Sequence, residues 1–234
     1  MIRLDKFLAQ TTDFSRNEIK KAIKQQQVLV DGEPVDSSAL KIATDAVVEL
    51  YGTPVSYQLH QYYMLNKPEG VVSATRDRNH ITAIDLLQVP NKEKLHIAGR
   101  LDKDATGLLL ITDDGDWTHR VISPRKHCHK VYHVDVDREL EPVLVRKFAE
   151  GIWLEGEKKR THPAELQIVS PLHARLVIHE GKYHQVKRMF AAVGNHVQHL
   201  HRSQIGGIVL DPELTAGEYR ALSAAEIAAI ATDV

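Results

Sequence analysis

The stretch that most constrains this chain is residues 95–112, in which a charged loop runs into a short apolar segment. The apolar segment, 107–112, begins with glycine and is rich in branched side chains, so it predicts a buried β-strand. The loop before it contains Arg100, Asp102, Lys103 and Asp104. A loop held against a buried strand is a rigid place to mount a reactive side chain. We therefore expect a candidate functional site in this loop.

Arg100 and Asp102 lie two residues apart, and in an extended backbone such residues point to the same side. A guanidinium beside a carboxylate keeps the carboxylate ionised and orients it. An ionised, oriented carboxylate is able to act as a nucleophile or as a base. On the residues alone, the alternative is an ion pair on the surface of a turn.

The composition is that of a globular protein with one large domain or two unequal ones. The chain has 234 residues, of which 43% are hydrophobic and 26% are charged. No apolar run approaches the roughly 20 residues of a membrane span, and residues 1–6 lack a signal-peptide pattern. The single cysteine, Cys128, excludes a disulfide framework and a thiolate zinc cluster. We expect a cytoplasmic protein with no membrane partner, because a reducing compartment suits this cysteine usage.

Charge is segregated along the chain, although the formal net charge is only −1. Residues 117–134 and 181–210 contain Lys and Arg but no Asp or Glu, and the balance becomes acidic after residue 210. This distribution predicts a basic cleft on an otherwise neutral body, which would suit a nucleic acid. Two solvated basic faces are the alternative.

The N-terminal residues have the pattern of a small helical unit with a basic face. Ser15 and Glu18 have the spacing of a capping box, which predicts the start of a helix. Within that helix Arg16, Lys20 and Lys24 recur every four residues, so their side chains share one face. A bland charged face of a helix is the alternative.

Domain boundaries follow from turns and breaks in periodicity. An Asp-Gly pair at 31–32 predicts a tight turn between short strands. Residues 53–61 show no periodicity and include proline, so they are predicted to form a linker. We expect a first domain at 1–52 and a second at 62–234.

Three groups of residues could be metal ligands, and the sequence favours none of them. His127, Cys128 and His129 offer a single thiol and have no matching second pair of ligands. The acidic residues at 113–116 lack the spacing of a calcium-binding loop. His196, His199 and His201 have near-alternating spacing, for which a strand edge is a plainer account than zinc. No metal and no cofactor is therefore predicted.

Five motifs in the chain resemble those of one enzyme family. They are L-N-K-P-x-G at 65–70, H-x-A-G-R-L-D-x-x-x-T-G-L-L-L-x-T at 96–112, K-x-Y at 130–132, E-G-x-x-H-Q-V-K-R-M at 180–189 and L-x-R-x-x-I-G at 200–206. Together they are similar to the pseudouridine synthases, above all to the RsuA-type branch (RsuA, RluB, RluE and RluF), which modifies ribosomal RNA.

The N-terminal residues resemble an S4 RNA-binding domain. The matching positions are 3–9, 15–16, 23, 28, 30–32 and 35. One departure is Gln26, which stands where S4 domains commonly have glycine.

The resemblance implies an α+β fold, with a mixed, mainly antiparallel sheet flanked by helices and a small N-terminal S4-like domain. The implied activity is the isomerisation of uridine to pseudouridine in 16S ribosomal RNA, with uridine 516 as the target. The protein would act as a monomer and without a cofactor. Its partner would be 16S ribosomal RNA or a small-subunit assembly particle.

The resemblance also implies a role for individual residues. Asp102 would be the nucleophile that attacks the sugar, with assistance to the departure of uracil as the alternative role. Arg100 and Lys187 would keep Asp102 charged and in place. Family members often have arginine at the position of Lys187. Tyr132 would form a wall for the extruded base, since a flipped base needs an aromatic or apolar surface. RNA contacts would go mainly to phosphates. The residues expected to make these contacts are Arg3, Arg16, Lys20, Lys24, Lys67, Lys130, Arg188 and Arg202.

Alternatives remain at this stage. The target could be large-subunit ribosomal RNA, or the chain could be a non-catalytic RNA-binding ribosome-assembly factor, which would have no need of Asp102. Glycoside hydrolysis needs a second carboxylate about 5 to 9.5 Å across the site, and Asp104, on the same loop, is a poor partner. Asn66 and Lys67 could simply cap their turn, Arg188 could be structural, and Tyr132 could be a core residue.

Overall fold

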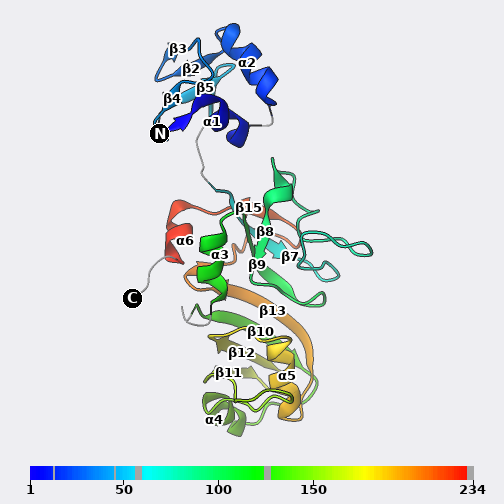
Figure 1. Cartoon of the computed structure of the whole chain (residues 1–234). Helices are drawn as coiled ribbons and strands as arrows, with labels where there is room; N and C mark the ends of the chain where they lie inside the picture. Colours follow the sequence, from blue (N-terminus) through cyan, green and yellow to red (C-terminus); the bar gives the residue numbers. More distant parts are fainter. Residues whose placement is uncertain (13, 45, 56–59, 124–127, 231–234) are drawn as a thin grey trace. The chain divides into compact units, whose positions relative to one another are not determined.

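A computed structural model describes the chain except residues 13, 45, 56–59, 124–127 and 231–234 (Figure 1). The chain forms two compact units. Unit 1 comprises Met1–His60 with Gln88–Lys94, and unit 2 comprises Gln61–Leu87 with Leu95–Val234. In the described part of the chain no helix is long and apolar enough to cross a membrane.

Unit 1 packs two helices against short strands. The helices are α1 (Leu4–Thr11) and α2 (Arg16–Lys24), and the 3-10 turn η1 (Lys92–Lys94) also belongs to this unit. One sheet pairs β1 (Ile2–Arg3) with β4 (Lys41–Ile42), and the other has the order β3 (Glu33–Pro34), β2 (Val28–Val30), β5 (Val48–Leu50), β6 (Thr53–Val55). The core is built by apolar side chains of both helices and of β2 and β5, which include Leu4, Phe7, Leu8, Ile19, Ile23, Val28 and Val48. The predicted capping box is present, with Ser15 and Glu18 hydrogen-bonded reciprocally.

Left-handed residues shape the turns of unit 1 and correct the predicted linker. Asp31 and Gly32 have φ of 52° and 85° and join β2 to β3, as predicted. Tyr51 and Gly52 have φ of 51° and 73°, and two positive values in a two-residue loop make a tight hairpin. Residues 53–55 are therefore a strand and not linker, and 56–59 lie outside the described residues.

Gln26, the position where S4 domains commonly have glycine, has φ of 53°. This is the left-handed conformation that glycine adopts without steric cost. Gln26 therefore adopts, at some steric cost, a conformation that glycine would adopt freely.

Unit 2 is built on one large sheet. Its strands follow the order β11, β12, β10, β13, β9, β7, β15, with β8 beside β9 and β14 beside β13. The bounds are β7 Tyr62–Lys67, β8 His96–Ala98, β9 Thr106–Thr112, β10 Lys130–Val136, β11 Glu165–Ser170, β12 His173–Ile178, β13 Val197–Ile205, β14 Ile208–Val209 and β15 Tyr219–Ala221. All described pairings in this sheet are antiparallel except β9 with β13, which is parallel. The α+β fold with a mixed, mainly antiparallel sheet is confirmed.

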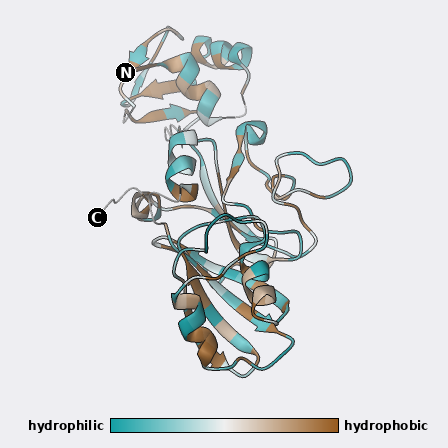
Figure 2. Ribbon diagram, turned by 60° about the horizontal axis from the view of Figure 1, so that its bottom comes forward, coloured by the Kyte–Doolittle hydropathy of each residue, from teal (hydrophilic) through white to brown (hydrophobic). Residues whose placement is uncertain are grey.

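Within the described residues the helices that accompany the sheet are α3 (Gly115–Ile122), α4 (Val143–Ala149), α5 (Gln185–Ala192) and α6 (Ala224–Ala229). Strand β9 is the buried strand predicted from the sequence, because its residues from Gly107 to Thr112 are all buried. Leu108 and Leu110 pack with Trp117 and Val121 of α3. In Figure 2 the strands of unit 2 carry long hydrophobic stretches, whereas many of the connecting loops are hydrophilic. The charged loop before β9 thus leads directly into a buried strand of the core.

Candidate active site

A half-open cavity of about 580 Å³ lies in unit 2, beside the loop that joins β8 to β9. Its walls come from segments far apart in the sequence: residues 72–73, the β8–β9 loop, β10, β13 and the residues before and at the start of α5. The lining includes five of the residues predicted for the site, Arg100, Asp102, Lys130, Tyr132 and Arg202. It also includes His184, which was not predicted.

Asp102 is the carboxylate of this cavity, and two basic side chains approach it. The Nε2 atom of His184 lies 3.4 Å from its Oδ1, and the Nζ atom of Lys187 lies 3.7 Å from its Oδ2. The Asp102 side chain is 27% exposed, so it is open to a ligand. The predicted pairing of Asp102 with Lys187 is therefore present within ion-pair distance.

Lys187 also binds a second carboxylate more closely. Its Nζ donates to Oδ1 of Asp104 at 2.5 Å, and this hydrogen bond lowers the pKa of Asp104. The Asp104 side chain is 64% exposed and does not line the cavity. Lys187 thus lies between two acids, of which Asp102 is the one that faces the cavity.

Arg100 does not take the place predicted for it. Among the described residues it forms no ion pair with Asp102, and its side chain is exposed at the cavity wall. The prediction assumed an extended backbone, but Gly99 has φ of 93° and the chain turns at Asp102, whose carbonyl accepts from Ala105 N at 3.1 Å. In a turn, residues i and i+2 no longer point to the same side.

The loop that carries Asp102 is fixed by three side chains from other segments. Lys67 Nζ donates to the carbonyls of Pro68, Lys103 and Ala105 at 2.9, 3.2 and 2.7 Å. Ser73 Oγ donates to Leu101 O at 2.7 Å and accepts from Leu101 N at 3.0 Å. These bonds lie on both sides of Asp102 in the sequence, so the loop is held at both ends.

Arg202 is the third of these side chains. Its Nη2 donates to Gly99 O at 2.7 Å, its Nη1 to Arg100 O at 3.2 Å and its Nε to Leu108 O at 2.9 Å. Gly107 makes this possible because β9 and β13 approach so closely there that a Cβ on Gly107 would lie 2.3 Å from Arg202 O.

Three of the predicted RNA contacts are corrected by burial. Lys67 is 0% and Arg202 is 1% exposed, and Lys130 is also buried, with its Nζ on Cys128 O. Burial lowers the pKa of Lys67 to about 8 and lowers that of Lys130. A buried side chain that is hydrogen-bonded to internal carbonyls cannot reach the phosphates of an RNA strand. These residues therefore stabilise the structure of the site. For Lys67, the alternative of stabilising its turn is the one that the contacts support.

Arg188 is likewise occupied. Its Nη1 donates to Glu157 Oε1 at 3.2 Å and to Tyr183 O at 3.1 Å, and its Nη2 donates to Glu155 O at 2.6 Å. The structural alternative considered for this residue is therefore supported, and its predicted phosphate contact is not.

Tyr132 is buried in β10 and lines the cavity. Its hydroxyl accepts from Arg202 Nη1 at 3.5 Å, and the centre of that guanidinium lies 6.0 Å from the centroid of the Tyr132 ring. The ring is thus held by the same arginine that holds the Asp102 loop. It provides the predicted aromatic wall, and it is at the same time a core residue.

His184 is the residue that the sequence reasoning missed. It precedes α5 with φ of 46°, a left-handed conformation that costs a residue with a side chain about 1–2 kcal/mol. Its ring stacks on that of Tyr183, with centroids 3.8 Å apart. The histidine was present in the motif at 180–189, but nothing in the spacing indicated that it would approach Asp102.

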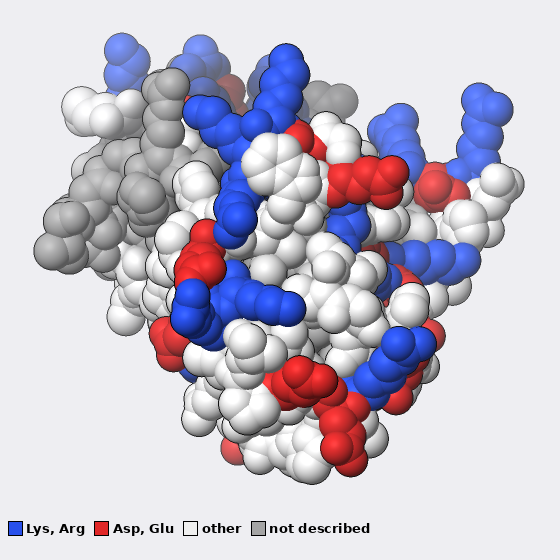
Figure 3. Space-filling model, turned by 90° about the horizontal axis from the view of Figure 1, so that it is seen from below, with Lys and Arg blue, Asp and Glu red and all other residues white. Residues whose placement is uncertain are grey.

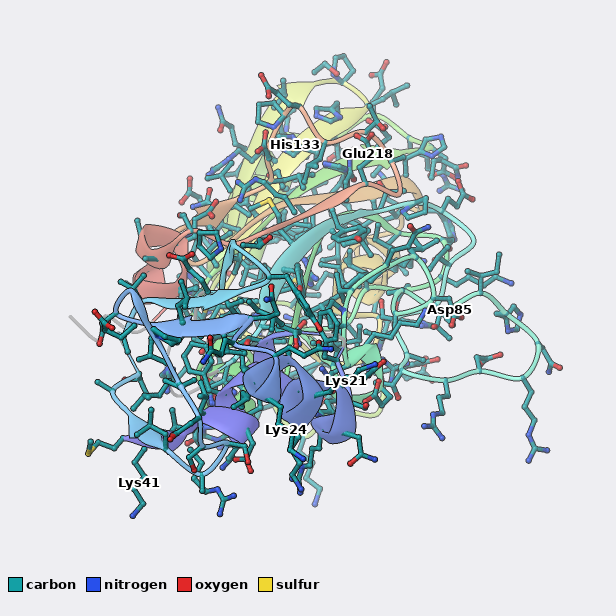
Figure 4. The ribbon with its side chains drawn as sticks, turned by 90° about the horizontal axis from the view of Figure 1, so that it is seen from above. Lys21, Lys24, Lys41, Asp85, His133 and Glu218 are labelled. Atoms are coloured by element: carbon teal, nitrogen blue, oxygen red, sulfur yellow. The ribbon has the colours of Figure 1, made fainter. Side chains whose placement is uncertain are left out.

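The predicted basic face of unit 1 is exposed. Arg16, Lys20 and Lys24 lie on α2 with no ion pair among the described residues, and Figure 4 shows Lys24 and Lys41 projecting outward. Arg3 is different, because its guanidinium binds the Asp5 carboxylate through two hydrogen bonds, which lower the pKa of Asp5. The charge of Arg3 is therefore largely neutralised by its neighbour.

The predicted basic cleft is not a continuous field on the face seen from below. There Lys and Arg side chains form several separate groups with Asp and Glu among them (Figure 3). Part of the basic stretch at 117–134, residues 124–127, lies outside the described residues. Within the described residues no group of three His, Cys, Asp or Glu could hold a metal ion, and His201 instead hydrogen-bonds Thr106.

A partly exposed carboxylate in an aromatic-walled cavity, together with a unit that has an exposed basic helix, fits an enzyme that modifies bases of a nucleic acid. The chain belongs to the RNA pseudouridylate synthase family, whose model matches residues 61–192, and an S4 domain matches residues 2–48.

Known proteins similar to the chain carry the same family name. The ribosomal small subunit pseudouridine synthase A of Escherichia coli strain K12 is 49% identical over 98% of this chain and 100% of its own length. The protein of that name from Vibrio cholerae is 46% identical over 98% of this chain and 99% of its own length. A crystal structure of a pseudouridylate synthase has 44% sequence identity and a TM-score of 0.71, and covers 98% of this chain and 100% of the other.

Proposed function

We propose that this protein isomerises one uridine of small-subunit ribosomal RNA to pseudouridine, with Asp102 as the nucleophile. The similarity to synthases named for the ribosomal small subunit supports the substrate. Within 16S ribosomal RNA we propose uridine 516 as the target. Large-subunit ribosomal RNA is the competing substrate, and a non-catalytic assembly factor would have no use for the cavity at Asp102.

The observation that carries the proposal is the position of Asp102. Its carboxylate is partly exposed in a cavity walled by Tyr132, with His184 and Lys187 within 4 Å. Taking a carboxylate out of water is costly unless cationic partners compensate, and the ammonium group of Lys187 is such a partner. The base must leave its stack to reach this carboxylate, and the buried ring of Tyr132 gives it a surface to pack against.

The reaction balances without an external reagent. A carboxylate oxygen of Asp102 attacks C1′ of the ribose, and the bond from C1′ to N1 of uracil breaks. The uracil turns within the cavity, and a bond from C5 to C1′ replaces the bond to Asp102. C5 then loses its proton and N1 gains one, so substrate and product have the same atoms.

Unit 1 would add affinity. Arg16, Lys20 and Lys24 would bind phosphates and so orient the RNA without reading its sequence. In this proposal residues 1–52 are the RNA-binding domain and 62–234 the catalytic domain. The protein acts as a cytoplasmic monomer on 16S ribosomal RNA or on a small-subunit assembly particle.

The test is release of tritium from unmodified 16S ribosomal RNA transcribed with tritium at C5 of uridine. The RNA is offered free and assembled with small-subunit proteins, and a transcript with cytidine at position 516 is the matched control. We expect one equivalent of tritium from the first RNA and none from the control. Asp102→Asn should abolish release while leaving RNA binding nearly intact, because the amide keeps the shape but is no nucleophile.

Three results would contradict the proposal. Release from large-subunit and not from small-subunit RNA would refute the substrate. Undiminished release from the transcript with cytidine 516 would refute the position. Turnover by the Asp102→Asn variant would exclude Asp102 as the nucleophile.

A further inference from the structure

Tyr183 is an exposed aromatic residue at the edge of the active-site cavity. Its side chain is 76% exposed, although it lines the same cavity as the buried Tyr132. Among the described residues its ring has one aromatic neighbour, His184. A tyrosine that packs so little of its ring into the protein contributes little to the core, so its position calls for another explanation.

The backbone beneath Tyr183 is fixed on both sides. Its carbonyl accepts from Arg188 Nη1 at 3.1 Å, and that guanidinium is itself bound to Glu157. The preceding residue, Lys182, donates from its backbone N to Gln185 Oε1 at 2.8 Å and from its Nζ to Glu157 Oε2 at 2.8 Å. An exposed ring on an anchored backbone is pre-organised, so a ligand would not have to order this segment on binding.

The ring of Tyr183 also lies beside a residue that contacts Asp102. It stacks on the His184 ring with centroids 3.8 Å apart and an angle of 20° between the planes. His184 Nε2 in turn lies 3.4 Å from Asp102 Oδ1. The Tyr183 ring is thus connected to the Asp102 carboxylate through one neighbouring side chain.

We propose that the open face of Tyr183 is a stacking subsite for the base of a nucleotide that flanks the target uridine. This rests on the proposed function, because it takes the target itself to be in the cavity at Asp102. Aromatic side chains that bind single-stranded RNA stack on unpaired bases and tolerate any base, since every base has a flat face. The subsite therefore holds the strand next to the reacting nucleotide and does not select its sequence.

Charge at the subsite favours a base over the other groups that a ring could bind. Lys182 and Arg188, on either side of Tyr183 in the sequence, are paired with Glu157, and Lys187 lies between Asp102 and Asp104. The cations of this segment are thus engaged by carboxylates, and the surface that Tyr183 itself offers is its ring. An exposed tyrosine is also a frequent anchor in protein interfaces. A comparison of free RNA with RNA assembled with small-subunit proteins distinguishes a protein contact from RNA stacking.

The experiment measures kcat and KM for tritium release from C5-tritiated 16S ribosomal RNA, free and assembled with small-subunit proteins. Tyr183→Ala should raise KM about 5- to 100-fold on free RNA, the range expected for loss of one base–aromatic stack, with kcat within about twofold. Tyr183→Phe keeps the ring and should restore the wild-type KM. Trp153→Ala, at an exposed aromatic residue that does not line the cavity, is the matched control and should leave KM unchanged.

A second variant measures RNA binding at the subsite independently of catalysis. Tyr183→Trp places an indole in the subsite, and a single-stranded uridine oligonucleotide should quench its fluorescence more than that of wild type. The fluorescence measurement distinguishes failure of the subsite from failure of the proposed function. If the wild-type protein releases no tritium from any RNA, the proposed function is refuted, and quenching in Tyr183→Trp still tests the subsite.

The inference is overturned by any of four results. These are an unchanged KM in Tyr183→Ala, a Tyr183→Phe variant as impaired as Tyr183→Ala, no quenching in Tyr183→Trp, and a defect of Tyr183→Ala seen on the assembled particle alone. The second would assign the effect to the hydroxyl group, and the last would assign Tyr183 to a protein contact.

Discussion

Gly107→Ala should damage both the stability and the activity of unit 2, because this glycine lies where β9 and β13 meet. The two strands are parallel there over only two residue pairs, His201 with Thr106 and Arg202 with Gly107. A Cβ on Gly107 would lie 2.3 Å from Arg202 O and 2.9 Å from Arg202 N. Both are backbone atoms, so the contact is relieved only if the strands move apart.

Two costs add up in this variant. Gly107 has φ of 100°, a sparsely populated region for residues with a side chain, which costs about 1–3 kcal/mol. Forcing extra volume into a packed core costs about 1–3 kcal/mol more. We therefore expect Gly107→Ala to lower the free energy of unfolding by about 2–6 kcal/mol. Separation of the strands would also pull the Arg202 guanidinium away from the carbonyls of Gly99 and Arg100, so kcat should fall with stability.

The assay is urea unfolding followed by circular dichroism, with tritium release measured in parallel. Two other glycines serve as controls. Gly156 has φ of 78° but nothing within 4 Å of its Cβ position, so Gly156→Ala should show the conformational cost alone. Gly115 has neither restriction and begins α3, so Gly115→Ala should be neutral or stabilising. A Gly107→Ala variant no less stable than Gly156→Ala would refute the argument from the close approach.

Two further predictions concern cations. Replacing Arg16, Lys20 and Lys24 together by glutamine should weaken RNA binding and reduce the slope of log K against log salt by about 2, measured by filter binding. The control variant Arg146→Gln, on α4, should leave the slope unchanged. Equal slopes in all variants would mean that the RNA contacts lie elsewhere. Burial lowers the pKa of Lys67 from 10.5 in the unfolded chain to about 8, so the unfolded state binds more protons between these values and wild-type stability should rise with pH there. In Lys67→Met this rise should be smaller by about 2 kcal/mol between pH 7.5 and pH 10, measured by urea unfolding. Parallel pH curves for the two proteins would contradict the assignment.

The sequence predicted well those features that depend on a local pattern. Strand β9 is evident from its apolar run, and the start of α2 from its capping box, since both arise from neighbouring residues. Asp102 was placed by the motif around it, and Lys187 by its spacing within a second motif. The family resemblance, and not periodicity, brought these two residues together in advance.

The burial of individual side chains and the directions in which they point were not predictable in the same way. Lys67, Lys130 and Arg202 were expected to reach RNA because lysine and arginine are usually exposed. Their burial depends on carbonyls supplied by a loop that is distant in sequence, which no local pattern reveals. Arg100 was placed beside Asp102 on the assumption of an extended backbone, but residues 99–105 form a loop between β8 and β9 and not a strand. The approach of His184 to Asp102 likewise depends on the tertiary arrangement of α5.

The three side chains that fix the Asp102 loop have a consequence for biosynthesis. Ser73 bonds to a residue 28 positions later in the chain, Lys67 to residues up to 38 positions later, and Arg202 to one 103 positions earlier. A chain still being synthesised, with every residue up to 190 already outside the ribosome, would possess the carboxylate, its lysine and its histidine. It would nevertheless lack the arginine that holds their loop. Catalytic competence should therefore arise only late in translation, after β13 has joined the sheet, so that an unfinished copy cannot modify RNA.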